Sequence, residues 1–170
     1  MKMFGITGWS GSGKTTLIRA LVRTLNIRSK VVAVVKHTHH LPLFGTPQDQ
    51  ALADAGACET MIVSPERWAL LHHYGPMPEW GAGALAARMG GVDLVLVEGF
   101  KRGGYPRLEV WDPSLGKPLL ADQDASILAV AADVDPARWG QKISWFRRDE
   151  VELIAEFVLN NCILVGEDVA

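Results

Sequence analysis

The chain lacks several features that would assign it to a class at once. It has two cysteines in 170 residues, Cys58 and Cys162, and they lie far apart. This argues against a disulfide scaffold or a paired-cysteine metal site, and it fits a reducing compartment. No apolar run is long enough to span a bilayer, and the N-terminus has no signal-peptide pattern. We therefore expect a soluble, cytoplasmic protein without a membrane partner.

A large excess of one charge is also missing. Lysine and arginine total 17 and the acidic residues 19, for a net charge of -2. No overall basic field results, so nucleic acid is not expected as a partner. The short basic pairs Lys101-Arg102 and Arg147-Arg148 can be solvated surface or phosphate contacts. The length favours a single globular domain over residues 1–170.

What the chain does contain is a glycine-rich motif at residues 8–15, Gly-Trp-Ser-Gly-Ser-Gly-Lys-Thr, directly after an apolar run. It matches the Walker A pattern G-x-x-x-x-G-K-[ST]. Gly8, Gly11 and Gly13 allow a tight turn whose N–H groups can bind phosphates, together with the positive end of a following helix. Lys14 is expected to reach the β- and γ-phosphates and the Thr15 hydroxyl to bind Mg²⁺.

The order of apolar patterns predicts the fold class. Strands are expected at 2–7, 30–35, 60–63, 68–71, 93–97, 107–110 and 127–130, and helices at 16–26, 47–55, 79–89 and 149–159. Alternating strands and helices indicate an α/β fold of the P-loop NTPase type, a mostly parallel sheet flanked by helices. Two connections look too short for a crossover helix. We therefore predict antiparallel hairpins or edge additions for 60–63 with 68–71, and for the chain from Val97 onward with 107–110.

Ligands of such sheets bind beyond the carboxyl ends of the strands. The second strand is followed there by Lys36-His37-Thr38-His39-His40. Lys36 and His37 can contact phosphates or a second anionic substrate, or the loop can simply be polar and solvated. We leave both readings open.

The strand at 93–97 leads into Glu98-Gly99-Phe100, the form of a Walker B element. Glu98 lies at the carboxyl end and is the predicted metal ligand, whereas Asp93 lies at the opposite end. Asp49 follows the histidine loop and is either a residue of a helix N-terminus or a second carboxylate near Mg²⁺.

Asp133 ends the strand at 127–130 and is a candidate reader of the nucleotide base, although it can equally cap a turn. Val130 and Ala131 stand where GTP-binding P-loop proteins carry the Asn-Lys of Asn-Lys-x-Asp. The motif alone therefore does not decide between guanine and adenine.

The phosphate motif, Lys36-His37-Thr38-His39-His40, Asp49, and Glu98-Gly99-Phe100-Lys101 with Pro106-Arg107-Leu108-Glu109-Val110 occur in this order. Together they resemble the molybdopterin-guanine dinucleotide biosynthesis protein B family, MobB, over most of the chain. The resemblance implies a homodimeric, cytoplasmic protein that binds GTP with Mg²⁺ and hydrolyses it weakly. It implies an accessory role beside the guanylyl transferase that makes molybdopterin guanine dinucleotide, with direct binding of molybdopterin left open.

The resemblance and the motifs together give a set of site residues. Lys14 and Glu98 are expected at the catalytic centre, and Thr15, Asp49 and Glu98 at the metal. The nucleotide is expected to contact Gly11, Ser12, Gly13, Lys14, Thr15, Thr16, Lys36, His37, Lys101 and Asp133. Arg107 is expected near the site without a defined role.

Two other functions share these features. A small-molecule kinase has the same loop and would need a lid, for which residues 101–107 are a candidate. A metal-delivery GTPase would use the histidines, which are His37, His39, His40, His72 and His73. The histidine pattern lacks the usual ligand spacing, so this function ranks last.

Overall fold

The computed structural model describes residues 1–38, 47–100, 103–134 and 143–165. The chain divides into two compact units, residues 1–37 together with 81–170, and residues 38–80. We call these the larger and the smaller unit. The single domain expected over residues 1–170 stays a prediction.

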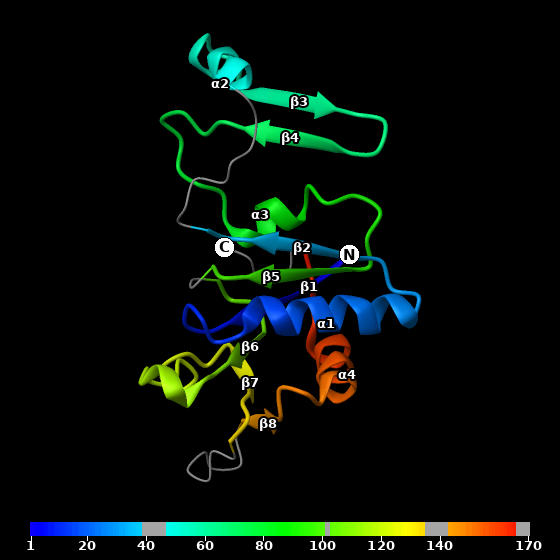
Figure 1. Ribbon diagram of the computed structural model, residues 1–170, viewed down its shortest axis with the longest axis vertical. Helices are drawn as coiled ribbons and strands as arrows, with labels where there is room; N and C mark the ends of the chain where they lie inside the picture. The colour runs from blue at the N-terminus through cyan, green and yellow to red at the C-terminus, as the bar shows by residue number, and fades with distance from the viewer. Residues whose placement is uncertain (39–46, 101–102, 135–142, 166–170) are drawn as a thin grey trace. The chain divides into compact units, whose positions relative to one another are not determined.

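The larger unit is built on a mostly parallel sheet of seven strands in the order β2-β5-β1-β6-β7-β8, with β9 antiparallel to the start of β1 (Figure 1). Its strands are β1 (Lys2–Thr7), β2 (Val32–Lys36), β5 (Leu94–Glu98), β6 (Arg107–Val110), β7 (Ile127–Ala131), β8 (Ser144–Phe146) and β9 (Ile163–Leu164). Its helices are α1 (Lys14–Ile27), α3 (Ala82–Ala86), the 3-10 turn η1 (Pro113–Leu115) and α4 (Val151–Asn161). The predicted fold class is confirmed.

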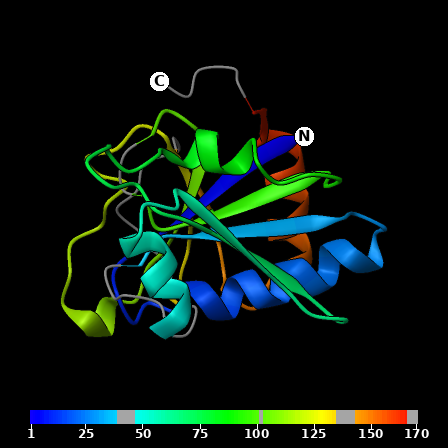
Figure 2. The ribbon, with the colours of Figure 1, turned by 90° about the horizontal axis from the view of Figure 1, so that it is seen from above.

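Helices cover both faces of this sheet, which explains its unbroken apolar strands. Phe4, Ile6, Leu94 and Leu96 point to one face and pack with α1 and α4, whereas alternate residues such as Val95 and Val97 pack on the other with α3. Figure 2 shows α1 and α4 on one side of the sheet and α3 on the other. The period of two along each strand thus divides one apolar run between two cores.

The first strand occupies the centre of the sheet. One edge of β1 pairs with β5, while the other pairs with β9 at its start and with β6 from Gly5 to Thr7. The register places Glu98 of β5 between Lys36 of β2 and Ile6 of β1. The carboxyl ends of these three strands therefore meet at one edge of the sheet. The glycine-rich loop follows β1 at this edge.

One predicted strand pairing is wrong. The strands β5 and β6 do not form a hairpin, because each lies parallel to β1 on an opposite side of it. The connection between them passes over β1 without a helix among its described residues. Short connections suggest hairpins only when no third strand occupies the place between the two.

Several elements differ from the sequence expectation. The helix expected at 79–89 is limited to Ala82–Ala86, in a segment with Gly81, Gly83, Gly90 and Gly91, which lower helix stability. The short elements η1, β8 and β9 were not expected. Segments of two or three residues carry too little periodicity to be recognised.

The smaller unit contains α2 (Pro47–Asp54) and the antiparallel pair β3 (Glu59–Val63) and β4 (Trp68–His72). This confirms the first predicted hairpin, whose turn closes with a hydrogen bond from Ser64 N to Arg67 O at 2.9 Å. At the end of β4 and just after it, the ring centres of His72 and Trp80 lie 4.0 Å apart, and those of Tyr74 and Trp80 lie 5.6 Å apart. These aromatic contacts give the unit a small packed cluster of its own.

One face of the β3–β4 ribbon is apolar and exposed. Met61 pairs with Leu70 and Val63 with Trp68, so the four side chains share a face. Their exposed fractions are 58%, 41%, 69% and 66%. Of the side chains described in this unit, none is buried. We call Met61, Val63, Trp68 and Leu70 the ribbon face.

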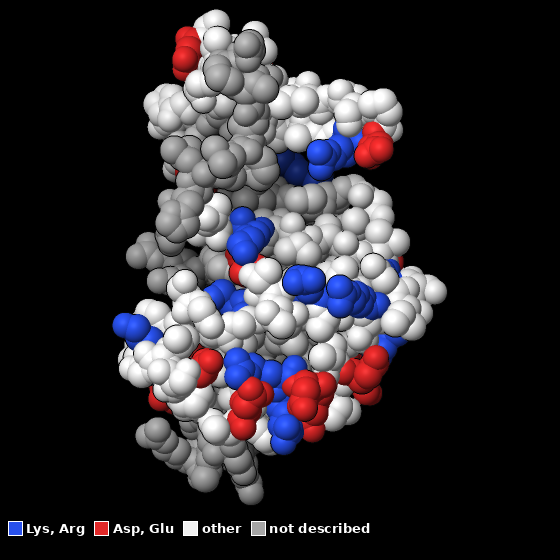
Figure 3. Space-filling model, in the orientation of Figure 1, with Lys and Arg blue, Asp and Glu red and all other residues white. Residues whose placement is uncertain are grey.

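The surface of the larger unit carries both signs of charge. In the lower part of the face seen in Figure 3, basic and acidic side chains lie side by side. Ion pairs such as Arg28 with Glu152 and Arg147 with Asp149 account for such neighbours. In the part of the chain that the structure describes, no helix has the length and apolar character required to cross a membrane.

Candidate functional site

The loop between β1 and α1 has the geometry of a phosphate cradle. We call residues 8–15 the phosphate loop. Gly8, Gly11 and Gly13 have φ angles of 139°, 84° and 98°, a region that side chains rarely adopt. A Cβ on Gly8 would also lie 2.3 Å from the carbonyl oxygen of Val110, so this position requires glycine. Consecutive peptides in such a conformation can turn their N–H groups toward a common anion.

The loop feeds directly into a helix of 14 residues. No side-chain hydrogen bond caps this helix at Gly13 among the described residues. The first N–H groups of α1 have no partner within the helix, and they add the positive end of the helix dipole to the cradle. The start of α1 is therefore suited to bind an anion.

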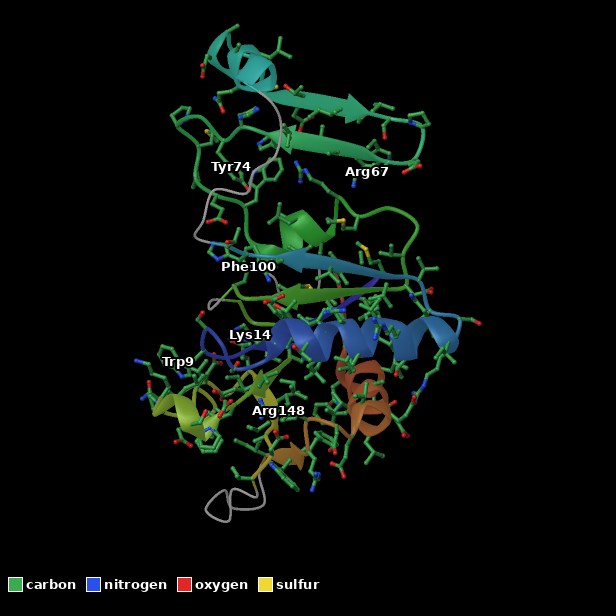
Figure 4. The ribbon with its side chains drawn as sticks, in the orientation of Figure 1. Trp9, Lys14, Arg67, Tyr74, Phe100 and Arg148 are labelled. Carbon is green, nitrogen blue, oxygen red and sulfur yellow. The ribbon has the colours of Figure 1, made fainter. Side chains whose placement is uncertain are left out.

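Lys14 folds back over the phosphate loop. Its Nζ donates hydrogen bonds to the carbonyl oxygens of Gly8, at 2.9 Å, and Trp9, at 2.7 Å. The ammonium group thus lies at the mouth of the loop, in the region marked by the labels of Trp9 and Lys14 in Figure 4. A positive charge held there complements the negative charge of a phosphate chain.

Thr15, Lys36 and Glu98 meet beside the loop. The Thr15 hydroxyl donates to Glu98 Oε1 at 2.9 Å. Lys36 Nζ lies 3.2 Å from both Thr15 Oγ1 and Glu98 Oε1. The Glu98 side chain is 7% exposed and that of Lys36 is 51% exposed, so the carboxylate is fixed inside while the ammonium group faces solvent. We call these three residues the Thr15–Glu98 centre.

The Thr15–Glu98 centre fits a magnesium ion chemically. Mg²⁺ prefers oxygen ligands, commonly one or two from the protein together with phosphate oxygens and water. A hydroxyl and a carboxylate at hydrogen-bond distance supply such ligands. The ammonium group of Lys36 presently interacts with the same two oxygens, so it would have to move when they bind a cation.

His37 lies next to this centre but contacts a ring. Its backbone N–H donates to Glu98 O at 2.9 Å, and its imidazole lies 5.0 Å from the ring of Phe100. The turn after β5 runs through positive φ angles of 93° at Gly99 and 36° at Phe100. A Cβ on Gly99 would lie 3.1 Å from that of His37, so the glycine permits the close approach of the two strand ends.

Asp133 follows β7 and forms an ion pair with Arg148. The hydrogen bond from Arg148 lowers the pKa of the Asp133 carboxyl below its usual value, and the same contact raises the pKa of Arg148. Arg148 Nη1 also donates to Ser12 O at 3.2 Å and lies 3.6 Å from Asp112 Oδ2. The sequence left Arg148 open between solvated surface and phosphate contact, and the structure places it on the carbonyl side of the phosphate loop.

Trp9 attaches the phosphate loop to the segment after β6. Its indole Nε1 donates to Pro118 O at 2.7 Å, and Lys117 Nζ lies 5.7 Å from its ring centre. Sequence reasoning assigned no role to this tryptophan. A bulky aromatic residue inside a glycine-rich loop was the available signal, because such a side chain needs a surface to pack against.

The structure gives the surroundings of some of the remaining expected site residues. Arg107 is buried and donates to Asp124 Oδ2 at 2.7 Å and Ser126 Oγ at 2.6 Å. Thr16 lies in the first turn of α1 and is exposed. Asp49 belongs to α2 in the smaller unit. Lys101, His39 and His40 fall outside the described residues.

Across the described ranges, no cluster of three or more His, Cys, Asp or Glu residues could hold a metal ion. His72 instead lies 3.0 Å from Glu59 Oε1 across the β3–β4 pair.

Comparisons with known proteins agree with the motif order. The family model described as Molybdopterin guanine dinucleotide synthesis protein B matches residues 3–133. The chain is 33% identical over 162 residues to a molybdopterin-guanine dinucleotide biosynthesis adapter protein of Escherichia coli (strain K12), covering 92% of this chain and 91% of the relative. It is 37% identical over 135 residues to the protein of the same description from Haemophilus influenzae, covering 77% and 74%.

Solved structures give the same result for the fold. A crystal structure of molybdopterin-guanine biosynthesis protein B aligns with a TM-score of 0.65 at 30% identity, covering 93% of this chain and 98% of the other. Bacillus subtilis MobB aligns with a TM-score of 0.70 at 22% identity, covering 98% and 100%. Family match, curated relatives and fold agree, and the chain belongs to the molybdopterin guanine dinucleotide synthesis protein B (MobB) family.

Proposed function

We propose that this protein binds GTP with Mg²⁺ at the phosphate loop and serves as an accessory factor in the synthesis of molybdopterin guanine dinucleotide. The observation that carries the proposal is the Thr15–Glu98 centre, where a Walker A hydroxyl and a strand-end carboxylate lie 2.9 Å apart beside a glycine-rich loop. Such a pair is what a nucleotide-bound magnesium ion requires of a protein.

Each residue of the site has a defined task in this proposal. The amides of the phosphate loop, with those of Gly11, Ser12 and Gly13 among them, bind the phosphate oxygens, and Lys14 leaves the carbonyls of Gly8 and Trp9 to reach the β- and γ-phosphates. Thr15 and Glu98 would hold the metal, which would supply positive charge to neutralise the phosphate oxygens. Lys36 contacts the same two oxygens, so the cation would displace its ammonium group, which would then be available to a phosphate.

Slow GTP hydrolysis follows from this arrangement. Positioning of the triphosphate and its metal already lowers the barrier for attack by water, and fast turnover in related reactions needs a water-orienting residue and an arginine finger. Arg107 does not serve as such a finger or as a kinase lid, because its guanidinium is buried against Asp124 and Ser126. The expected enzyme activity is therefore weak.

The accessory role comes from the curated relatives, which are called adapter proteins of molybdopterin-guanine dinucleotide biosynthesis. We infer that this chain works in the cytoplasm beside the guanylyl transferase of that synthesis. Its bound GTP would be presented to the transferase, and contact with molybdopterin itself is compatible with this placement.

We further propose that the protein is a homodimer joined through the ribbon face. Met61, Val63, Trp68 and Leu70 form an apolar surface on an isolated pair of strands. A two-stranded ribbon is marginally stable alone, and an exposed apolar patch of this kind is typical of a protein interface. A second copy of the ribbon would cover it with a matching surface, as two-fold symmetry requires.

Calorimetric titration tests the nucleotide proposal. GTP and ATP are added separately to the purified full chain with Mg²⁺ present, and again with EDTA. GTP binding that is tighter than ATP binding and that weakens without Mg²⁺ is expected. ATP affinity equal to or above that of GTP, or no binding of either nucleotide, contradicts the proposal.

A further inference from the structure

Arg148 connects three loops at the carboxyl edge of the sheet. Its guanidinium donates to Ser12 O in the phosphate loop, forms an ion pair with Asp133 after β7, and lies 3.6 Å from Asp112 after β6. Figure 4 shows Arg148 below the Lys14 end of α1. A guanidinium has five N–H donors in a rigid fork, so one side chain can hold several acceptors at once.

The sheet register brings Arg148 and Asp133 together. Ala131 of β7 pairs with Phe146 of β8, and Ala132 N donates to Phe146 O at 3.0 Å. Asp133 and Arg148 each stand two residues beyond that pair, just after two parallel neighbouring strands. Arg147, next in the chain, instead pairs with Asp149 at 3.1 Å and is 57% exposed. The two adjacent arginines therefore have different environments.

The bond to Ser12 O affects the phosphate side of the loop. The Ser12 carbonyl and the Gly13 N–H belong to one planar trans peptide, in which the two groups point in opposite directions. Holding the carbonyl from behind therefore turns the Gly13 N–H away from Arg148. A Cβ on Gly13 would lie 3.4 Å from Arg148 Nη1, which shows how closely the arginine packs behind the loop.

We propose that Arg148 is a positioning residue of the nucleotide site: it aligns the Ser12–Gly13 peptide for the phosphates and holds the Asp133 carboxylate for the base. The inference builds on the proposed GTP function. A carboxylate has acceptor sites for more than one donor, so Asp133 can keep Arg148 and accept hydrogen bonds from guanine N1–H and its exocyclic amine. Adenine offers no N–H at the ring position N1, so the same carboxylate favours guanine.

The test compares five full-length proteins, of which four are the wild type, Arg148→Ala, Arg148→Lys and Asp133→Asn. Arg147→Ala is the matched control, because it removes the neighbouring arginine from a solvent-exposed pair. Each protein is titrated with GTP, ATP and inorganic tripolyphosphate in the presence of Mg²⁺. Circular dichroism and thermal unfolding report on the fold.

Arg148→Ala is expected to weaken GTP binding about tenfold and to lower the GTP-to-ATP preference. Tripolyphosphate binding should weaken too, because the Gly13 amide loses its alignment. Asp133→Asn should lower the GTP preference while leaving tripolyphosphate binding unchanged. Arg148→Lys should bind less tightly than wild type, because an ammonium group lacks the planar fork, and Arg147→Ala should match wild type.

The outcomes separate the inference from the proposed function. If wild type binds no GTP, the proposed function fails. If wild type binds GTP but Arg148→Ala keeps its affinity and preference, the role of Arg148 is overturned while the function stands. A variant that only unfolds earlier, with unchanged preference, also overturns it. If Arg148→Ala fails to fold, unchanged ligand binding in both Arg148→Lys and Asp133→Asn overturns the role of Arg148 instead.

Discussion

At the scale of single residues, the two lysine ammonium groups of the candidate site are bound to acceptors of the protein itself. Lys14 hydrogen-bonds two loop carbonyls, and Lys36 interacts with the hydroxyl and carboxylate of the Thr15–Glu98 centre. On binding of a nucleotide, both ammonium groups would exchange protein acceptors for phosphate oxygens. This exchange costs less than exposing an unpaired charge, because neither ammonium group is left without a hydrogen bond.

Lys14→Ala should weaken GTP binding about ten- to hundredfold, since it removes charge-assisted hydrogen bonds to the phosphates. The fold should be retained, because Lys14 is only half-buried and its bonds lie within the loop. Calorimetry with GTP and Mg²⁺ measures the change. Lys30→Ala, an exposed lysine just before β2, is the control and should bind normally. Unchanged GTP affinity in folded Lys14→Ala protein would refute the assignment.

Glu98→Gln should reduce GTP hydrolysis on the order of tenfold and affect GTP binding less. The amide keeps an acceptor for Thr15 but loses the negative charge that holds the metal and Lys36. Phosphate release and GTP affinity are measured on the same preparation. Equal losses of the two would assign Glu98 a scaffolding role instead.

The sequence indicated part of this candidate site. Residues of the phosphate loop, Lys36 and Glu98 were recognised because they lie at or just after the ends of strands, and parallel strands bring their carboxyl ends to one edge. Arg148 could not be placed in the same way, since β8 is three residues long and one partner of the arginine is a backbone carbonyl. Every residue has a backbone carbonyl, so no sequence motif can show which one an arginine binds.

At the scale of elements, α1 joins the phosphate loop to the core. Leu21 of α1 is fully buried in the core that α1 forms with the sheet and α4, whereas Ile27 at the end of α1 is 84% exposed. Leu21→Ala should lower the free energy of unfolding by about 3 kcal/mol, through lost apolar burial and a residual cavity. Ile27→Ala should change it by less than about 0.5 kcal/mol. Denaturant titration of both variants checks this contrast, and similar losses would contradict the packing described.

The segment after β6 depends on a buried acid. Glu109 is fully buried and accepts hydrogen bonds from Leu120 N at 3.0 Å and Ala121 N at 2.9 Å. Burial raises the pKa of Glu109 above its ordinary value of 4.5. A raised pKa means that the folded state binds the proton more tightly than the unfolded state, so this contribution to stability is present below pH 4.5 and declines as pH rises through the folded pKa.

Glu109→Gln removes this titration. The stability of wild type relative to Glu109→Gln should therefore fall as pH rises from about 4 toward 7. Thermal unfolding of both proteins over that range measures the difference. A difference that is constant with pH would show that burial of the carboxyl does not control this segment.

The prediction of strand pairing succeeded where a recognisable turn joined two apolar runs, and it failed where the pairing depended on a third strand. The hairpin β3–β4 was recognised from two apolar runs joined by Ser64-Pro65-Glu66-Arg67. The relation of β5 to β6 was missed because nothing local to residues 94–110 shows that β1 lies between them. Non-local pairing of this kind is invisible to a window of sequence.

At the scale of the whole molecule, the ribbon face is the feature that assembly would cover. Trp68→Lys should raise the dimer dissociation constant by about thirtyfold or more, because it places a charge in an apolar contact. Light scattering after size-exclusion chromatography measures the mass as a function of concentration. Leu153→Lys on α4 is the control, since Leu153 is 52% exposed outside the ribbon. A wild-type protein that stays monomeric, or a Trp68→Lys variant that stays dimeric, would contradict this interface.

The partners of the central strand have a dynamic consequence. Because β1 is bonded to β5 along one edge and to β9 and then β6 along the other, its amide hydrogens should be among the last to exchange with solvent. The phosphate loop thus follows the strand of the sheet that we expect to exchange most slowly. Motions that admit or release a nucleotide would then have to arise outside β1.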